Sequence, residues 1–185
     1  MINNEDSSLQ NQVELIELNN LNDFDDEFQR LYMQAFPADE RREWQQIIDL
    51  TENINHTIVQ IYLKSKFVGF IIYWKFPEFI FIEHFAILPE ERSKGYGFQA
   101  LEKFIHEVLE PVVLEVEEPN STVAIKRIRF YEKLYFRINS GIYFQPPYSV
   151  TKNAVKMLLM SFPKRLSETE FEKAKSRIYK AVYRV

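Results

Sequence analysis

The stretch PEERSKGYGFQALEKFI, residues 89–105, decides how the rest of the chain is interpreted. Two of the four glycines of the chain, Gly95 and Gly97, lie in it, between an apolar run that predicts a buried strand and a run with helical spacing. Glycine inside regular structure costs roughly 0.5–1 kcal/mol relative to alanine. This pair of glycines therefore indicates a place where the backbone must closely approach another group.

A strand that ends in a tight glycine turn and runs into a helix offers unpaired backbone N–H groups, which suit a phosphate. Arg92 and Lys94 flank the turn and add positive charge. The spacing does not fit GxxxxGK[ST] or GxGxxG; it is Arg-x-x-Gly-x-Gly. The alternative is that the glycines only form a tight turn between strand and helix, with both cations solvated.

The composition limits the class of protein. The 185 residues carry a formal net charge of −4 and no cysteine, which argues against a nucleic-acid footprint, a disulfide scaffold, a thiolate metal site and a cysteine nucleophile. No apolar run approaches the roughly 20 residues of a membrane span, and the polar, acidic start does not resemble a signal peptide. We expect a cytoplasmic protein with a disordered lead-in at 1–12 and one domain at 13–185.

Hydrophobic periodicity predicts the elements along the chain. The predicted strands are 13–18, 56–64, 67–75, 79–88, 112–118, 141–149 and 153–161, and the predicted helices are 24–35, 40–50, 101–109, 120–135 and 167–183. Ser167 and Glu170 form a capping-box pattern at the start of the last helix. This order predicts an α/β fold with a central mixed sheet of about seven strands, helices on both faces and an extra C-terminal helix.

Three stretches together resemble the GNAT superfamily of N-acetyltransferases. FAILPEERSKGYG resembles the acetyl-CoA-binding motif R/Q-x-x-G-x-G/A, which directly follows the central strand of that fold. LEVEEPN (114–120) is similar to the next strand and its asparagine, and RFYEKLYF (129–136) to the helix end written YxKLGF. Two departures are that Tyr135 stands where the family has a glycine, and that Asn120 to Tyr131 is about one helical turn longer than in many members.

The resemblance implies acetyl-CoA as cosubstrate. Its pyrophosphate would be held by backbone N–H groups of Arg92, Ser93, Lys94, Gly95, Tyr96, Gly97 and Phe98. Its pantetheine arm would lie along Phe85, Ala86 and Ile87, and Asn120 would complete the cofactor site. No pair of histidines has ligand spacing on one face, so we expect no metal.

Tyr131 is the candidate general acid. A phenol with a pKa near 10 is protonated at neutral pH, and the resemblance implies that this tyrosine sits by the sulfur of coenzyme A. Since cysteine is absent, direct attack of the amine in a ternary complex is the simpler mechanism. The alternative is that Tyr131, on the apolar stripe of its helix, is only a core aromatic.

Two carboxylates compete for the role of base. Glu83 interrupts the apolar run FIFIEHFAIL, and strand alternation predicts that it shares a face with Phe81, Phe85 and Ile87 while His84 points to the other face. Partial burial would raise its pKa toward the working range. Glu115 is the rival, because ribosomal-protein N-terminal acetyltransferases resemble its stretch and use its glutamate. Either could instead pair with a lysine.

We therefore expect an acetyl-CoA-dependent N-acetyltransferase that acts on a primary amine of a small molecule or peptide. The alternative is a GNAT-like protein that binds acyl-CoA without turnover, as a sensor or scaffold. Neither nucleic acid nor a membrane is an expected partner, and the protein is expected to be a monomer or a homodimer.

Overall fold

The computed structural model describes residues 12–18 and 26–185. The predicted lead-in, apart from residue 12, and the predicted helix start at Phe24 lie outside the described residues. The regular elements are β1 (Val13–Glu17), α2 (Asp26–Ala35), α3 (Trp44–Asp49), β2 (His56–Leu63), β3 (Lys66–Lys75), β4 (Ile80–Ile87), α4 (Tyr96–Val108), β5 (Val112–Glu117), α5 (Thr122–Lys133), β6 (Arg137–Ile138), β7 (Tyr143–Gln145), β8 (Val155–Phe162) and α6 (Glu168–Ile178). A π-helical turn, Tyr179–Tyr183, continues α6.

The strands form one mixed sheet, as predicted. Its order is β1-β2-β3-β4-β5-β8-β6, with β7 also paired to β8, which makes eight strands rather than about seven. The additional strand, β6, has only two residues, too few for a hydrophobic period to reveal it. The pairing of β4 with β5 is parallel, and each of the other pairings in the described chain is antiparallel.

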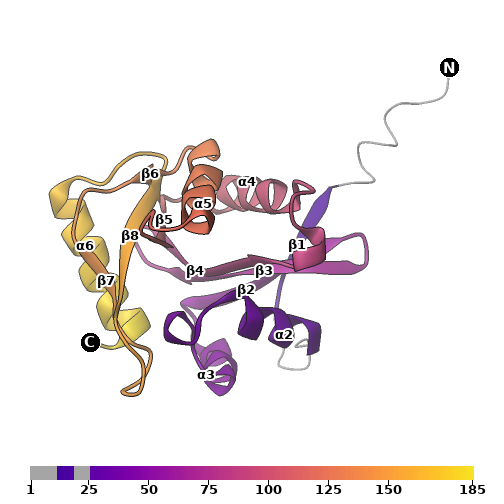
Figure 1. Cartoon of the computed structure of the whole chain (residues 1–185), viewed down its shortest axis with the longest axis horizontal. Coiled ribbons are helices and arrows are strands. Elements are labelled where there is room, and N and C mark those ends of the chain that lie inside the picture. Colours follow the sequence, from indigo (N-terminus) through magenta and orange to yellow (C-terminus); the bar gives the residue numbers. More distant parts are fainter. Residues whose placement is uncertain (1–11, 19–25) are drawn as a thin grey trace.

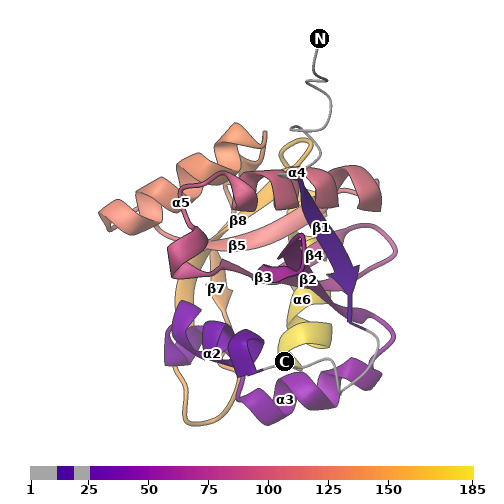
Figure 2. The same ribbon diagram turned by 90° about the vertical axis from the view of Figure 1, so that its right-hand side faces the viewer.

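Helices cover both faces of the sheet (Figures 1 and 2). α4 and α5 pack on one face through an apolar cluster that includes Leu101, Phe104 and Ile128. α2 and α3 pack on the other face through Phe28, Tyr32 and Ile47, among others. α6 lies beside β7 and β8 (Figure 1) and buries its own apolar side against a third cluster. The predicted capping box at the start of α6 is confirmed, with both of its hydrogen bonds present.

β4 and β5 run together for only part of their length. They pair at three positions, the last of which joins Ile82 and Leu114. β4 then continues to Ile87 and β5 to Glu117 without further pairing between them. Beyond Ile82 the two parallel strands therefore diverge, and the edge of β4 that faces β5 no longer has a backbone partner there.

A β-bulge interrupts β4 at Glu83. On β3, Tyr73 pairs with Ile82 and the next residue, Ile72, pairs with His84, so Glu83 is the extra residue. A bulge reverses the alternation of side chains beyond it. Phe85 and Ile87 accordingly join the cluster under α4 and α5, whereas His84 contacts the rings of Tyr32 and Phe36 on the opposite face. The predicted alternation is therefore wrong beyond Glu83: Glu83 and His84 lie on the same face, and Phe85 and Ile87 on the other.

Candidate active site

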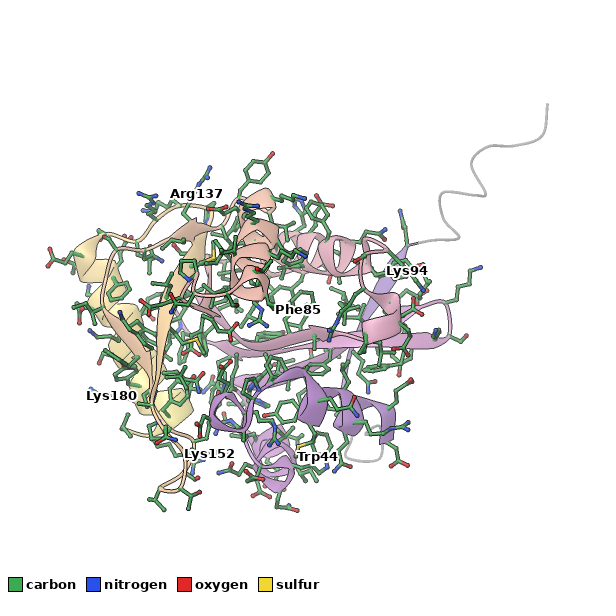
Figure 3. The ribbon with its side chains drawn as sticks, in the orientation of Figure 1. Trp44, Phe85, Lys94, Arg137, Lys152 and Lys180 are labelled. Atoms are coloured by element: carbon green, nitrogen blue, oxygen red, sulfur yellow. The ribbon has the colours of Figure 1, made fainter. Side chains whose placement is uncertain are left out.

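A cleft of about 650 Å³ opens where β4 and β5 part. Its lining comes from both strands, the glycine turn, α5 and the end of α2. Eleven residues predicted for the site line it: Glu83, Phe85, Ala86, Ile87, Arg92, Ser93, Gly95, Gly97, Phe98, Glu115 and Tyr131. The side chain of Phe85 lies between β4 and α5 (Figure 3), where its ring stacks on that of Phe130 with the centroids 6.1 Å apart.

The two glycines of the turn are required for different reasons. Gly95, the residue before α4, has a φ of +87°, which side chains with a β-carbon rarely tolerate. Gly97 is in the first turn of the helix, where a β-carbon would lie 3.2 Å from Cγ1 of Ile87 and 3.5 Å from Cζ of Phe85. Gly97 therefore lets the helix start sit directly on β4. The first N–H groups of α4, which have no acceptor within the helix, open at the end of the cleft.

Arg92 and Lys94, the two cations next to the turn, each have a partner within the protein. Nε of Arg92 donates to the carbonyl of Ile87 at 3.0 Å, so this side chain is tied to the end of β4. Lys94 does not line the cleft; its Nζ lies 3.0 Å from Oε2 of Glu91, at the far end of the turn from Phe85 (Figure 3). The lining of the cleft instead includes Lys126 and Lys133 of α5. Their spacing of seven residues places them on one helical face, a signal that sequence reasoning did not use.

Tyr131 belongs to both the cleft and the core. It lines the cleft and is only 6% exposed, within the apolar cluster under α5. Burial raises the pKa of its phenol to about 12, against a smaller opposing effect of Arg127. The hydroxyl therefore keeps its proton throughout the neutral range.

Glu83 is held in a buried ion pair. Its Oε1 accepts from Nε of Arg42 at 2.8 Å and its Oε2 from Nε1 of Trp74 at 2.6 Å. Burial alone would raise the pKa of this carboxyl, but Arg42, the nearby histidines and the indole N–H together lower the pKa to about 2. The expected rise in the pKa of Glu83 is therefore wrong, because the sequence does not reveal Arg42 as its partner.

Glu115, rather than Glu83, is the candidate base whose pKa is raised toward the neutral range. It lies on β5, lines the cleft, and accepts hydrogen bonds from the phenols of Tyr143 and Tyr183. Burial raises the pKa of its carboxyl to about 8; the two phenols oppose this rise, and the charges of Glu83 and Glu40 add to it. A carboxyl with this pKa exchanges a proton near neutral pH.

Glu40, which sequence reasoning missed, is a further carboxyl of the cleft. Partial burial and the neighbouring Glu117 raise its pKa to about 7. Glu117 itself is paired with Arg127, with 2.8 Å between Oε2 and Nη1. The lining of the cleft thus combines acidic side chains from β5 and from the segment after α2.

The model of the Acetyltransferase (GNAT) family matches residues 21–136. The chain belongs to the GNAT family. A candidate acetyltransferase of this family from Bacteroides thetaiotaomicron is 32% identical, with a TM-score of 0.85 over 94% of this chain and 99% of that one. YjbC of Bacillus subtilis (strain 168), a candidate acetyltransferase, is 27% identical over 116 residues, which are 61% of this chain and 60% of that protein.

A GNAT-family acetyltransferase from Elizabethkingia anophelis, solved with acetyl-CoA bound, has the same fold at 15% identity. Its TM-score is 0.60, over 81% of this chain and 97% of that one.

Two departures from the GNAT motifs have structural outcomes. Tyr135, in place of the glycine, adopts a φ of +65° after the end of α5 and is 68% exposed, so the left-handed position is kept without glycine. Asn120 is exposed, just before the cap residue Ser121 of α5, and does not line the cleft. Tyr96, at the first position of α4, does not line it either.

In the part of the chain that the structure describes, no helix is long and apolar enough to span a membrane. The same residues contain no group of three His, Cys, Asp or Glu side chains placed to hold a metal ion.

Proposed function

We propose that this GNAT protein transfers the acetyl group of acetyl-CoA to a primary amine, with Glu115 as the general base and Tyr131 as the general acid. The observation that carries the proposal is that these two side chains line one cleft, and that their pKa values, about 8 and about 12, suit opposite proton transfers. In this proposal Glu83, the other candidate base, stays ionised and paired with Arg42.

The thioester would enter the cleft between β4 and β5. The helix start at Gly95 offers N–H groups and a positive dipole end to the pyrophosphate. The unpaired edge of β4 beyond Ile82 offers backbone groups to the pantetheine amides. The bound acetyl-CoA of the Elizabethkingia anophelis protein, which has the same fold, supports this cosubstrate.

The chemical step needs no covalent enzyme intermediate. Glu115 takes a proton from the acceptor ammonium, and the neutral nitrogen attacks the thioester carbonyl carbon. The new C–N bond forms, the C–S bond breaks, and Tyr131 gives its proton to the departing thiolate. The nitrogen then loses its second proton, which restores the phenol of Tyr131, and Glu115 releases its proton to solvent. The acceptor is an amine of a small molecule or a peptide.

The test measures coenzyme A release with a thiol reagent, in which a chain without cysteine gives no background. A panel of amines and short peptides first identifies an acceptor. Tyr131→Phe should then lower kcat by about 10²–10⁴-fold, the usual contribution of a general acid, with unchanged thermal stabilisation by acetyl-CoA. Tyr135→Phe, an exposed tyrosine beyond the same helix, is the matched control and should keep full activity.

Full kcat in Tyr131→Phe, with chemistry rate-limiting, would assign the tyrosine to the core alone. Binding of acetyl-CoA without acceptor-dependent release across the panel would favour the non-catalytic alternative, a sensor or scaffold.

A further inference from the structure

The C-terminal end of the chain contacts Glu115 through Tyr183, a residue that does not line the cleft. The π-helical turn Tyr179–Tyr183 lies on the face of the sheet that carries α2 and α3 (Figures 1 and 2). Oη of Tyr183 is 2.9 Å from both Oε1 and Oε2 of Glu115. Tyr183 is 7% exposed and does not line the cleft, so it contacts the carboxyl without being placed to contact a substrate.

A second phenol approaches the same carboxyl from β7. Tyr143, which is 1% exposed, donates from its hydroxyl to Oε1 of Glu115. Both tyrosines lie outside residues 21–136, which the family model matches. Two phenols therefore hold the buried side of Glu115, and both come from parts of the chain beyond the residues that the family model matches.

The position of Tyr183 is fixed by further contacts. Nη2 of Arg42 donates to the carbonyl of Val182 at 2.7 Å, while Nε of the same guanidinium holds Glu83. Oη of Tyr148 is 3.4 Å from Oη of Tyr183. The side chain of Val182 is 1% exposed in the cluster around α6. The turn is thus held at Val182 and at the hydroxyl of Tyr183.

We propose that Tyr143 and Tyr183 are positioning residues, which orient the carboxylate of Glu115 toward the acceptor amine and favour its ionised form. The proposal rests on the proposed function, in which Glu115 takes the proton of the amine. Both phenols donate, so each stabilises the carboxylate more than the neutral acid. Because they engage the oxygens from the side away from the cleft, the remaining lone pairs are free for the amine.

The other groups around Glu115 act in the opposite direction. Burial disfavours its charge, and the carboxylates of Glu83 and Glu40 repel it. The buried guanidinium of Arg42 is paired with Glu83. The two phenols are therefore what keeps the pKa of Glu115 within reach of neutral pH.

The experiment is a pH titration of the full chain, labelled with ¹³C at the side-chain carboxyl of glutamate and followed by NMR without ligand. The Glu115 signal is identified by its loss in Glu115→Gln. Tyr183→Phe and Tyr143→Phe should each raise the midpoint of this signal by about one pH unit, as expected for the loss of one hydrogen bond to a charge. Tyr73→Phe, which removes a buried phenol of β3 that contacts neither Glu115 nor the two tyrosines, should leave the midpoint unchanged.

With an acceptor in hand, the acidic limb of the kcat/KM profile should move by the same amount in the first two variants, while the KM for acetyl-CoA stays constant. Unchanged midpoints in Tyr183→Phe and Tyr143→Phe would overturn the proposal. If Tyr183→Phe does not fold, the midpoint of Tyr143→Phe decides alone. Shifted midpoints in a protein that acetylates no acceptor would uphold the contact of the phenols with Glu115 and refute the proposed function instead.

Discussion

Arg42 and Glu83 form a buried ion pair across 41 positions of the sequence, with 2.8 Å between Nε and Oε1. The side chains are 7% and 0% exposed, respectively. The same guanidinium holds the C-terminal turn at Val182, and its centre lies 4.6 Å from the ring centroid of Tyr148. The residue at the bulge in β4, Glu83, therefore takes part in an ion pair. Through Arg42 this pair connects the segment before α3, the central strand and the end of the chain.

Glu83→Gln should destabilise the protein. A buried pair that loses one partner leaves an uncompensated charge, here that of Arg42, at a cost of about 3 kcal/mol. The folded pKa of Glu83, about 2, lies below its unfolded value of about 4.3. The contribution of this carboxylate is therefore fully present above the unfolded pKa and is lost as the pH falls through the folded pKa.

Urea denaturation at pH 7 and at several lower pH values measures this effect. The deficit of Glu83→Gln relative to wild type should shrink as the pH falls from about 5 toward 2. Glu172→Gln, which breaks an exposed pair with Lys175, is the control and should change the stability little. A variant as stable as wild type at pH 7 would show that the ion pair adds no net stability.

The second prediction concerns Gly97. In Gly97→Val the new side chain would press on Ile87 and Phe85 and push the start of α4 away from β4. Coenzyme A at 100 times its dissociation constant should stabilise the wild-type protein by about 2.7 kcal/mol, and the variant should lose this stabilisation. Glu102→Val, on the exposed side of α4, is the control and should keep it. An equal shift in melting temperature for Gly97→Val and wild type would remove the glycine turn from the cosubstrate site.

The sequence was sufficient for the features that depend on local pattern. The change of period at Gly95, the capping box at Ser167 and the apolar run of β4 each follow from neighbouring residues. The bulge at Glu83 could not be predicted in this way, because it is a property of the register between β4 and β3. Alternation counted along one strand misses it and assigns the wrong face to the side chains that follow.

The same limit explains why the raised pKa was predicted for Glu83 and is found for Glu115. Whether burial raises or lowers the pKa of a carboxyl depends on its partner. Arg42 is 41 positions from Glu83, and Tyr183 is 68 positions from Glu115. Neither partner is adjacent in sequence or marked by a motif, so only the folded chain identifies which carboxyl is paired with a cation and which with phenols.

The third prediction concerns Tyr135. Its left-handed backbone, with φ at +65°, is unfavourable for a residue with a β-carbon by about 1 kcal/mol or more. Tyr135→Gly should therefore raise the free energy of unfolding, by up to about 1 kcal/mol, since the greater freedom of glycine in the unfolded chain offsets part of the gain. The side chain is 68% exposed, so little packing is lost. Tyr135→Ala keeps the β-carbon and should give no such gain; if both variants behave alike, the backbone is not strained.

The last prediction uses the raised pKa of Glu115 as a property of the fold, independent of any substrate. The folded pKa is about 8 and the unfolded pKa is about 4.3, so the folded state holds this proton more tightly. The stability that comes from Glu115 is fully present below the unfolded pKa and is lost as the pH rises through the folded pKa.

Glu115→Gln cannot ionise and avoids this loss. Its stability relative to wild type should therefore improve steadily between about pH 4.5 and 8, and then level off. Urea denaturation across this range, with Glu102→Gln on the exposed side of α4 as the control, measures the difference. A difference between Glu115→Gln and wild type that stays constant with pH would show that Glu115 titrates normally and would remove the physical basis for its role as the base.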